Sequence, residues 1–144
     1  MLLVETYLDR SALSGIGVFT THALAAGTRI WEPRPWVDLR FSAQQWELWL
    51  ERLSLPVQAD MRRHSYKEGG AIVLCLDNAR FMNHGGDASN VENEAATDTM
   101  FARWDIAAGS ELLCDYRAYS DSDDVHLLAL DARWEAPHAP AADL

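Results

Sequence analysis

Residues 77–90 hold the densest group of side chains in this chain that could take part in binding or catalysis. They place Asp, Arg, Asn and His residues around two large apolar ones, Phe81 and Met82, and include a Gly-Gly-Asp turn at residues 85–87. The pattern has neither a helical nor a strand period, which indicates a backbone bent around something small. The glycines would let this backbone approach a ligand closely or adopt a positive φ. The residues alone leave a second interpretation open, a capped turn whose Asn and Asp side chains bond their own backbone.

Three short motifs, taken together, resemble those of a known family. Residues 15–19 read Gly-Ile-Gly-Val-Phe, residues 80–84 read Arg-Phe-Met-Asn-His, and residues 111–116 read Glu-Leu-Leu-Cys-Asp-Tyr. They resemble the Gly-x-Gly-Val-Phe, Arg-Phe-x-Asn-His and Glu-Leu-x-x-Asp-Tyr motifs of SET-domain protein-lysine N-methyltransferases, in the same order. Three ordered motifs are a more specific signal than any one of them. The resemblance implies an enzyme that transfers methyl groups from S-adenosylmethionine to the side-chain amine of a lysine in a protein substrate.

The resemblance also implies which residues bind the cofactor. The Gly-x-Gly segment would wrap S-adenosylmethionine with backbone groups, although such a pair is also common in turns. Asn83 would bind the amino-acid end of the cofactor and His84 its adenine end, unless His84 is a hydrogen-bonded turn residue. Arg80 and Phe81 would support and line the pocket. A C-terminal aromatic residue would stack on adenine or, equally, anchor the tail. The implied cofactor-binding residues are therefore Gly15, Ile16, Gly17, Arg80, Phe81, Asn83, His84 and Trp134.

Methyl transfer to lysine needs a neutral amine held in line with the donor methyl group. The free amine has a pKa of about 10.4, and both desolvation and a neighbouring sulfonium charge favour loss of its proton. Tyr116 matches the family's catalytic tyrosine, whose hydroxyl would orient the amine without acting as a general base. Tyr66 and Tyr119 are further candidates for the walls of the lysine channel.

Cys114 stands two residues before Tyr116, where related enzymes have a Phe or Tyr that helps limit the number of methyl groups added. Cysteine is smaller and forms only weak hydrogen bonds, so we predict a substrate channel with room for more than one methyl group. The alternative is that Cys114 points into the core, as free cysteines often do. In that case Tyr66 or Tyr119 would act as the gate.

The sequence departs from the family pattern at two places. The central motif commonly continues as Ser-Cys and then Pro-Asn, whereas residues 85–90 read Gly-Gly-Asp-Ala-Ser-Asn, and Ser110 stands where a glutamate is usual. These positions look supportive rather than reactive, which keeps the enzyme as the first hypothesis. The alternative is a catalytically weak SET module that acts mainly by binding a basic protein partner.

Composition and charge indicate one acidic domain. A chain of 144 residues with 49% hydrophobic and 24% charged residues fits a single globular unit. We expect one SET domain over residues 1–134 and a flexible C-terminal tail over residues 135–144. The net charge of −10 argues against nucleic-acid binding. It would attract a basic protein or peptide substrate, although plain solubility explains the charge equally well.

The apolar and cysteine patterns indicate the compartment. No apolar run reaches the ~20 residues of a membrane helix, and the first residues lack the features of a signal peptide, so we expect a cytoplasmic protein with no membrane partner. Cys75 and Cys114 form no Cys-x-x-Cys pair, which predicts reduced thiols and no metal site. Many eukaryotic SET enzymes carry cysteine-rich flanks that this chain lacks, so it resembles a minimal, bacterial member.

The expected fold is mainly β with short helices. Short runs rich in β-branched and aromatic residues predict strands at residues 1–7, 17–21, 28–32, 72–76, 91–95 and 99–104. Ser42 and Gln45 fit a capping box before a helix that Pro56 ends or interrupts, and a second helix is expected over residues 125–134. The family resemblance adds a β-clip-like SET fold of small curved sheets with a C-terminal pseudoknot.

The first helix also suggests an oligomer. Its apolar face carries Trp46 and Trp49, with Leu50 and Leu53 at helical spacing, which is far more typical of core packing than of a ligand site. A SET domain without flanking modules leaves its substrate groove poorly covered. We therefore expect a homodimer in which a neighbour, through one of these tryptophans or the C-terminal segment, completes the site.

Overall fold

The computed structural model describes residues 1–134, with side chains for residues 1–130, and is mainly β with short helices, as predicted. Its strands are β1 (Thr6–Arg10), β2 (Ile16–Thr20), β3 (Arg29–Trp31), β4 (Asp38–Phe41), β5 (Ser65–Glu68), β6 (Ala71–Cys75), β7 (Asn83–His84), β8 (Val91–Glu94), β9 (Thr99–Ala102) and β10 (Leu113–Cys114). The helices are α1 (Ala43–Leu50), α2 (Leu55–Arg63) and α3 (Val125–Trp134), with short 3₁₀ turns η1 (Asn78–Phe81), η2 (Gly86–Ala88) and η3 (Tyr116–Ala118). Within the described residues, no helix has the length and apolar character needed to cross a bilayer.

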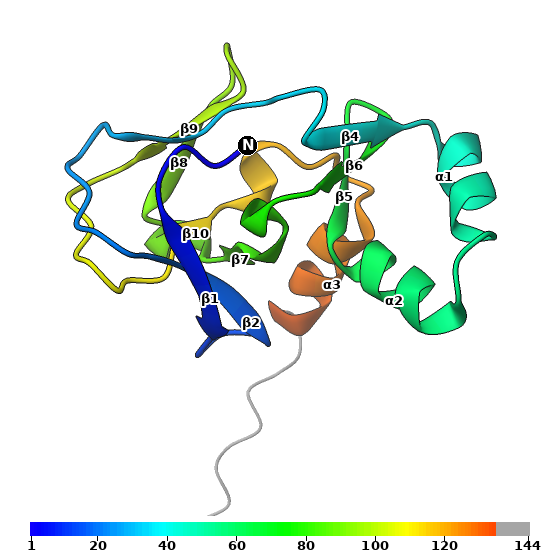
Figure 1. The fold of residues 1–144 in the computed structure, drawn as a ribbon, viewed down its shortest axis with the longest axis horizontal. Helices are drawn as coiled ribbons and strands as arrows, with labels where there is room; N and C mark the ends of the chain where they lie inside the picture. The colour runs from blue at the N-terminus through cyan, green and yellow to red at the C-terminus, as the bar shows by residue number, and fades with distance from the viewer. Residues whose placement is uncertain (135–144) are drawn as a thin grey trace, which may run out of the picture.

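The strands form small sheets rather than one large one. Antiparallel pairing joins β1 to β2, β3 to β9 to β8, and β4 to β6 to β5. Strands β7 and β10 pair in parallel, with Leu113 opposite Asn83 and Cys114 opposite His84. This pairing places the last motif directly against the central one, as the expected pseudoknot requires. In Figure 1, β8, β9 and β10 lie in the left half of the molecule, α1 and α2 at the right end, and β7 between them.

Two hydrophobic clusters hold these sheets together. The larger one joins the inward faces of β2, β3, β6, β8, β9 and β10, and its buried members are Val18, Leu24, Ile30, Trp31, Cys75, Met82, Val91, Met100, Ala102, Ile106, Leu112 and Cys114. The smaller cluster packs α1 on β6 through Trp46, Leu50 and Leu74. Trp46 is buried in this cluster, so of the two α1 tryptophans only Trp49 lines a surface groove, and the homodimer stays a prediction.

Local signals predicted α1 and α3 well and the remaining elements less well. The capping box is present, because Ser42 Oγ accepts from the Gln45 N–H and the Gln45 side chain accepts from the Ser42 N–H. Helix α3 covers the predicted residues. The predicted strand at residues 1–7 is wrong, since β1 begins at Thr6 and Leu2 makes only an isolated bridge to Trp31.

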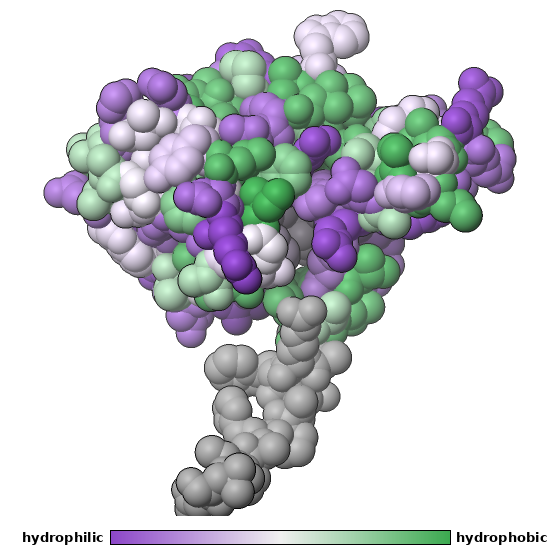
Figure 2. Space-filling view, turned by 60° about the horizontal axis from the view of Figure 1, so that its bottom comes forward, coloured by the Kyte–Doolittle hydropathy of each residue, from purple (hydrophilic) through white to green (hydrophobic). Residues whose placement is uncertain are grey.

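Strands β4, β5, β7 and β10 and helix α2 have no counterpart in the sequence predictions. Strand β4 follows a proline-rich stretch, and α2 carries Pro56 in its first turn, where proline's fixed φ is tolerated. Pro56 therefore begins a second helix. The predicted tail over residues 135–144 lies outside the described residues. Figure 2 shows hydrophobic residues gathered close to the end of the described chain, where α3 exposes Val125 and Leu128.

Candidate functional site

Asn83 joins the central motif to the two other motifs. Its side-chain Nδ2 donates to the carbonyls of Ser14 and Ile16, at 3.1 Å each, and to Oε1 of Glu111 at 2.9 Å. The Gly-x-Gly loop is therefore fastened to β7 by a side chain 67 to 69 residues away along the chain. This use of the amide N–H groups leaves the side-chain carbonyl oxygen of Asn83 as its group for a cofactor.

Glu111 is a structural residue of the site that the sequence analysis named only as part of a motif. Its Oε2 accepts from Ser11 Oγ at 3.0 Å, and its side chain lies flat against Gly17. A Cβ atom at position 17 would fall 2.1 Å from Glu111 Oε1, so a larger residue there would force this carboxylate to move. The second glycine of the loop is thus required by the close approach of a carboxylate. The first, Gly15, has a φ of +52° and open space where a Cβ would stand.

Asn90 fixes the strand that carries the last motif. Its Nδ2 donates to the Glu111 carbonyl and its Oδ1 accepts from the Leu113 N–H, both at 2.8 Å. The Asn90 side chain thereby makes the hydrogen bonds that a neighbouring strand would otherwise make to the backbone leading into β10. Gly85 completes the contact, because a Cβ there would lie 2.8 Å from Cβ of Leu113. The glycine that departs from the family pattern is therefore needed for this close packing.

The ring of His84 lies against the motif at residues 111–116. The backbone N–H of Tyr116 donates to His84 Nδ1 at 3.1 Å, which assigns the proton of a neutral ring to Nε2. The rings of His84 and Tyr116 have centroids 5.1 Å apart. Asp115 Oδ1 is 3.6 Å from the same Nδ1, beyond hydrogen-bond reach. Asp115 is instead bonded by Arg117, which holds the pKa of this carboxyl below its usual value.

Tyr116 has the geometry of a positioned, neutral phenol. Its hydroxyl donates to the Met82 carbonyl at 2.8 Å, across the β7–β10 pair. Burial, reinforced by nearby Cys114, raises the pKa of Tyr116 well above its usual value. The hydroxyl is therefore protonated at physiological pH, as the prediction of an orienting rather than a basic role requires.

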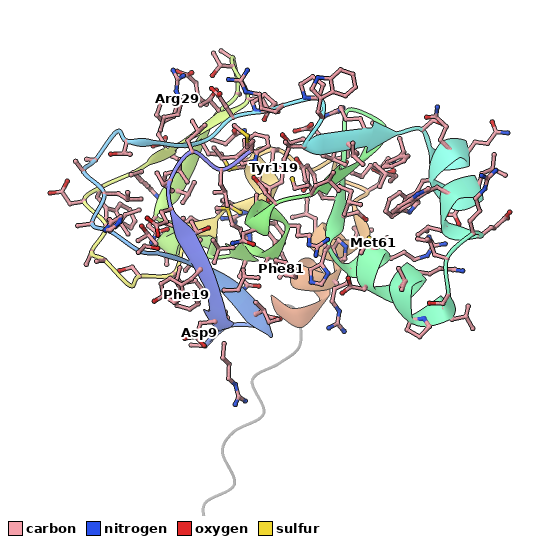
Figure 3. All side chains as sticks on the ribbon, in the orientation of Figure 1. Asp9, Phe19, Arg29, Met61, Phe81 and Tyr119 are labelled. Carbon is pink, nitrogen blue, oxygen red and sulfur yellow. The ribbon has the colours of Figure 1, made fainter. Side chains whose placement is uncertain are left out.

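The candidate channel residues form one aromatic group with Tyr116. Tyr119, labelled in Figure 3, is partly buried against the larger hydrophobic cluster, with its ring centroid 5.0 Å from that of Tyr66 and 6.1 Å from that of Tyr116. The Tyr119 hydroxyl is 3.4 Å from Sγ of Cys114. Burial raises the pKa of the Cys114 thiol to about 11, so the thiol is neutral. Cys114 is a core residue and also contacts this aromatic group. The two alternatives, a cysteine in the core and a cysteine beside the candidate channel, therefore both describe its place.

Arg80 and Phe81 lie in η1, next to Asn83. The Arg80 guanidinium lies over the Phe81 ring, with its Cζ 4.7 Å from the centroid, and the His64 ring approaches Phe81 at 4.7 Å. Within the described residues, Nε of Arg80 is buried and has no hydrogen-bond partner. One face of Phe81 is thus covered, and Phe81 is partly buried against the larger hydrophobic cluster. The side chain of Trp134 lies outside the described residues.

A cavity opens beside Cys114 and Tyr119. It has a volume of about 380 Å³, and its lining includes the acidic residues Asp87, Glu92 and Asp115 and the basic Arg103. The Oγ of Ser89, a residue almost fully buried in the lining, has no hydrogen-bond partner among the described residues. The described residues contain no cluster of three His, Cys, Asp or Glu side chains able to hold a metal ion.

Small antiparallel sheets around a parallel pair that joins two motifs define the fold of a SET domain. Residues 15–117 match the SET domain family, and because this match covers well over half of the sequence, the chain belongs to that family. Members of this family are generally S-adenosylmethionine-dependent protein-lysine methyltransferases. Among curated proteins, no sequence matches this chain.

A solved structure has the same fold. The crystal structure of a candidate histone methyltransferase from Plasmodium falciparum aligns with a TM-score of 0.50 and 17% sequence identity. The alignment covers 80% of this chain and 95% of that protein. At this identity the likeness supports the fold.

Proposed function

We propose that this protein transfers methyl groups from S-adenosylmethionine to the side-chain amine of a lysine in a protein substrate. The observation that carries the proposal is the place of Tyr116. Its ring contacts His84 of the motif expected to bind the cofactor and also lies beside Tyr119 of the expected acceptor channel. Its neutral hydroxyl is fixed by the Met82 carbonyl. Tyr116 would therefore lie between the residues expected to bind the cofactor and those expected to line the acceptor channel.

The donor groups on one side of Tyr116 fit the chemistry of the proposed cofactor. Carbonyls and amides of the loop at residues 14–17 and the amide oxygen of Asn83 suit an ammonium and a carboxylate. The unpartnered Nε of Arg80 offers a cation to the carboxylate. His84 and the aromatic residues nearby would hold the adenine end. When bound, S-adenosylmethionine supplies an electrophilic methyl group on a sulfonium.

The acceptor side suits a neutral lysine amine. Burial raises the pKa of Tyr66, Tyr116 and Tyr119, so their hydroxyls offer hydrogen bonds and aromatic walls but no negative charge to retain an ammonium. A lysine that enters such a site loses hydration, which lowers its pKa. These residues would thus help the amine lose its proton and hold it in line with the donor.

The proposed substrate is a basic segment of a protein. The chain carries a net charge of −10, and the cavity beside Cys114 has three acidic residues and one arginine in its lining. Arg117 already neutralises much of the charge of Asp115. Arg117 also pairs with Asp87 at 3.1 Å, so Glu92 and the net charge of the chain would provide most of the attraction for a basic peptide.

Calorimetric titration with S-adenosylmethionine, followed by transfer of a tritiated methyl group into proteins of a cell extract, tests the proposal. We expect saturable binding and a labelled protein band that disappears in the Tyr116→Phe variant. Absence of binding at millimolar concentration would overturn the enzyme and favour a SET module that only binds a basic partner.

The size of Cys114 predicts the product. Because this side chain is small and borders a cavity, we propose that more than one methyl group is added to each lysine. Cys114→Tyr would fill the space beside the Tyr119 hydroxyl and shift the product toward monomethyl-lysine. Mass spectrometry of the methylated substrate measures this shift, with Cys75→Ser as a control in the other buried cysteine. Strict monomethylation by the unaltered protein would place the gate elsewhere.

A further inference from the structure

Strand β5 lies at the edge of the β4–β6–β5 sheet, and a short acidic loop closes that edge. The acidic loop comprises residues 121–124, Asp-Ser-Asp-Asp, between η3 and α3. The Asp121 N–H donates to the Lys67 carbonyl at 2.7 Å, and the Lys67 N–H donates to Asp124 Oδ2 at 2.5 Å. Both backbone groups of Lys67 that face away from β6 are thus taken by the loop.

The strongest attachment of the loop is at the turn between β5 and β6. Gly69 and Gly70 have φ values of +56° and +76°, and their two N–H groups point to the same side. Asp121 receives both, with Oδ1 bonded to the Gly69 N–H and Oδ2 to the Gly70 N–H at 2.8 Å each. These two bonds lower the pKa of the Asp121 carboxyl, so the attachment is made by the charged form.

Tyr119 is held between this attachment and η3. Its own N–H and that of Ser120 donate to the Tyr116 carbonyl, at 3.3 and 2.9 Å. Asp121 follows two residues after Tyr119 and fixes the chain to the hairpin. The ring is thereby kept against Tyr66 of β5, with its hydroxyl on the Cys114 thiol. Without the Asp121 carboxylate, the chain after Tyr119 would be attached to β5 by the two bonds of the Lys67 backbone and would lose its attachment to the Gly69–Gly70 turn.

We propose that Asp121 is a positioning residue, which holds Tyr119 over Cys114 by binding the Gly69–Gly70 turn and so closes the wall of the acceptor channel. The closure of Cys114 depends only on the contacts above, whereas its effect on methyl transfer rests on the proposed function. Loss of the attachment would expose Cys114 and loosen the channel on the Tyr119 side.

Thiol labelling of the native protein tests the closure directly, because the chain has two cysteines and both are buried. The protein is treated with N-ethylmaleimide, and mass spectrometry follows Cys114 and Cys75 separately. In Asp121→Ala we expect Cys114 to react at least tenfold faster than in the unaltered protein, with Cys75 unchanged as an internal reference for global unfolding. Asp123→Ala is the matched control, since Asp123 is an exposed neighbour whose carboxylate, among the described residues, pairs with the Lys67 ammonium alone.

Two results would overturn the proposal. One is an unchanged Cys114 rate in Asp121→Ala, and the other is a parallel rise at Cys75, which would show general loosening. Should the alanine variant fail to fold, Asp121→Asn, which keeps one acceptor oxygen, must still raise the Cys114 rate above that of Asp123→Ala.

Enzyme kinetics separate this inference from the function on which it draws. If methyl transfer occurs, Asp121→Ala should raise the KM for the protein substrate several-fold while Asp123→Ala leaves it unchanged. If the unaltered protein transfers no methyl group, the proposed function fails, and the labelling result still decides the role of Asp121.

Discussion

The centre of the candidate site and the α1 region are built in different ways. At the centre, a few side chains bond backbone groups far away in the chain, as Asn83 does with Ser14 and Asn90 with Leu113. At α1, the decisive polar contacts lie within the four residues from Ser42 to Gln45, and a small apolar cluster does the rest. Figure 1 shows the two regions apart, with the site around β7 and β10 and the helices at the end of the molecule.

This difference shows where function is sensitive to single substitutions. A change at the centre alters the distance between the three motifs, and with it both stability and the geometry needed for methyl transfer. A change at the start of α1 alters the stability of one helix. Two substitutions that lower the free energy of unfolding by similar amounts should therefore differ in their effect on methyl transfer, according to the region in which they lie.

The largest effect is expected for Gly17→Ala. The added Cβ would collide with Glu111 Oε1 at 2.1 Å and would force this carboxylate away from Asn83 and Ser11. Overpacking of this kind, together with the broken bonds, should lower the free energy of unfolding by about 3 kcal/mol. Urea unfolding measures the loss, and calorimetry should show weakened cofactor binding.

A double variant tests whether Glu111 is the cause. In Glu111→Ala the obstacle is gone, so adding Gly17→Ala should cost at least about 1 kcal/mol less than it does in the unaltered protein. Additive losses in the double variant would show that the collision is not the reason for the glycine.

Asn90→Ala should have the next largest effect. It leaves the Glu111 carbonyl and the Leu113 N–H without their partner, and an unsatisfied buried group costs about 1–3 kcal/mol. We expect a loss of about 2–3 kcal/mol in the free energy of unfolding, since solvent relieves part of the cost. Asn78→Ala is the control, because Asn78 makes one long bond of 3.3 Å to Thr6. Equal losses for the two variants would contradict the special place of Asn90.

Tyr116→Phe should separate activity from stability at the centre. Loss of the hydroxyl removes the bond to the Met82 carbonyl, at a cost of about 1 kcal/mol in stability. Turnover should fall by about tenfold or more, the size of one lost transition-state contact. Tyr7→Phe, at a half-exposed ring stacked on Phe19, should change neither quantity. Unaltered methyl transfer by Tyr116→Phe would show that the family's catalytic role does not apply here.

The same contrast explains what the sequence could predict. The capping box, the tryptophan spacing and the residue range of α3 follow from contacts within a few residues, and all three were predicted correctly. The motif resemblance predicted the family and the fold. Neither source could show that Glu111 packs on Gly17, or that Asp121 binds the Gly69–Gly70 turn, because each contact joins segments more than 50 residues apart.

Some site residues could not be recognised for a related reason. Asn90 read as the last member of a polar turn, and its two bonds to the backbone around β10 depend on the parallel pairing of β7 and β10. The composition of the acidic loop is typical of a solvated loop or a helix cap. Asp124 does bond two N–H groups at the start of α3, but Asp121 turned out to bond the hairpin. Composition carries no information about such partners.

The smallest effect is expected at the start of α1. Ser42→Ala removes a side chain that accepts from the Gln45 N–H, and the loss of such a cap costs about 1 kcal/mol. The matched control is Ser54→Ala, since Ser54 precedes α2 without a side-chain cap bond and should cost less than about 0.5 kcal/mol. Urea unfolding of both variants measures the difference.

Ser42→Ala also tests whether the two regions act independently. Helix α1 contacts β4 and β6 through its small cluster, and none of the residues in that cluster belongs to the three motifs. We therefore expect Ser42→Ala to leave S-adenosylmethionine binding and the Cys114 labelling rate unchanged. A change in either, at a stability cost of only about 1 kcal/mol, would show that the β4–β6–β5 sheet transmits the loss to the site and that the regions are coupled.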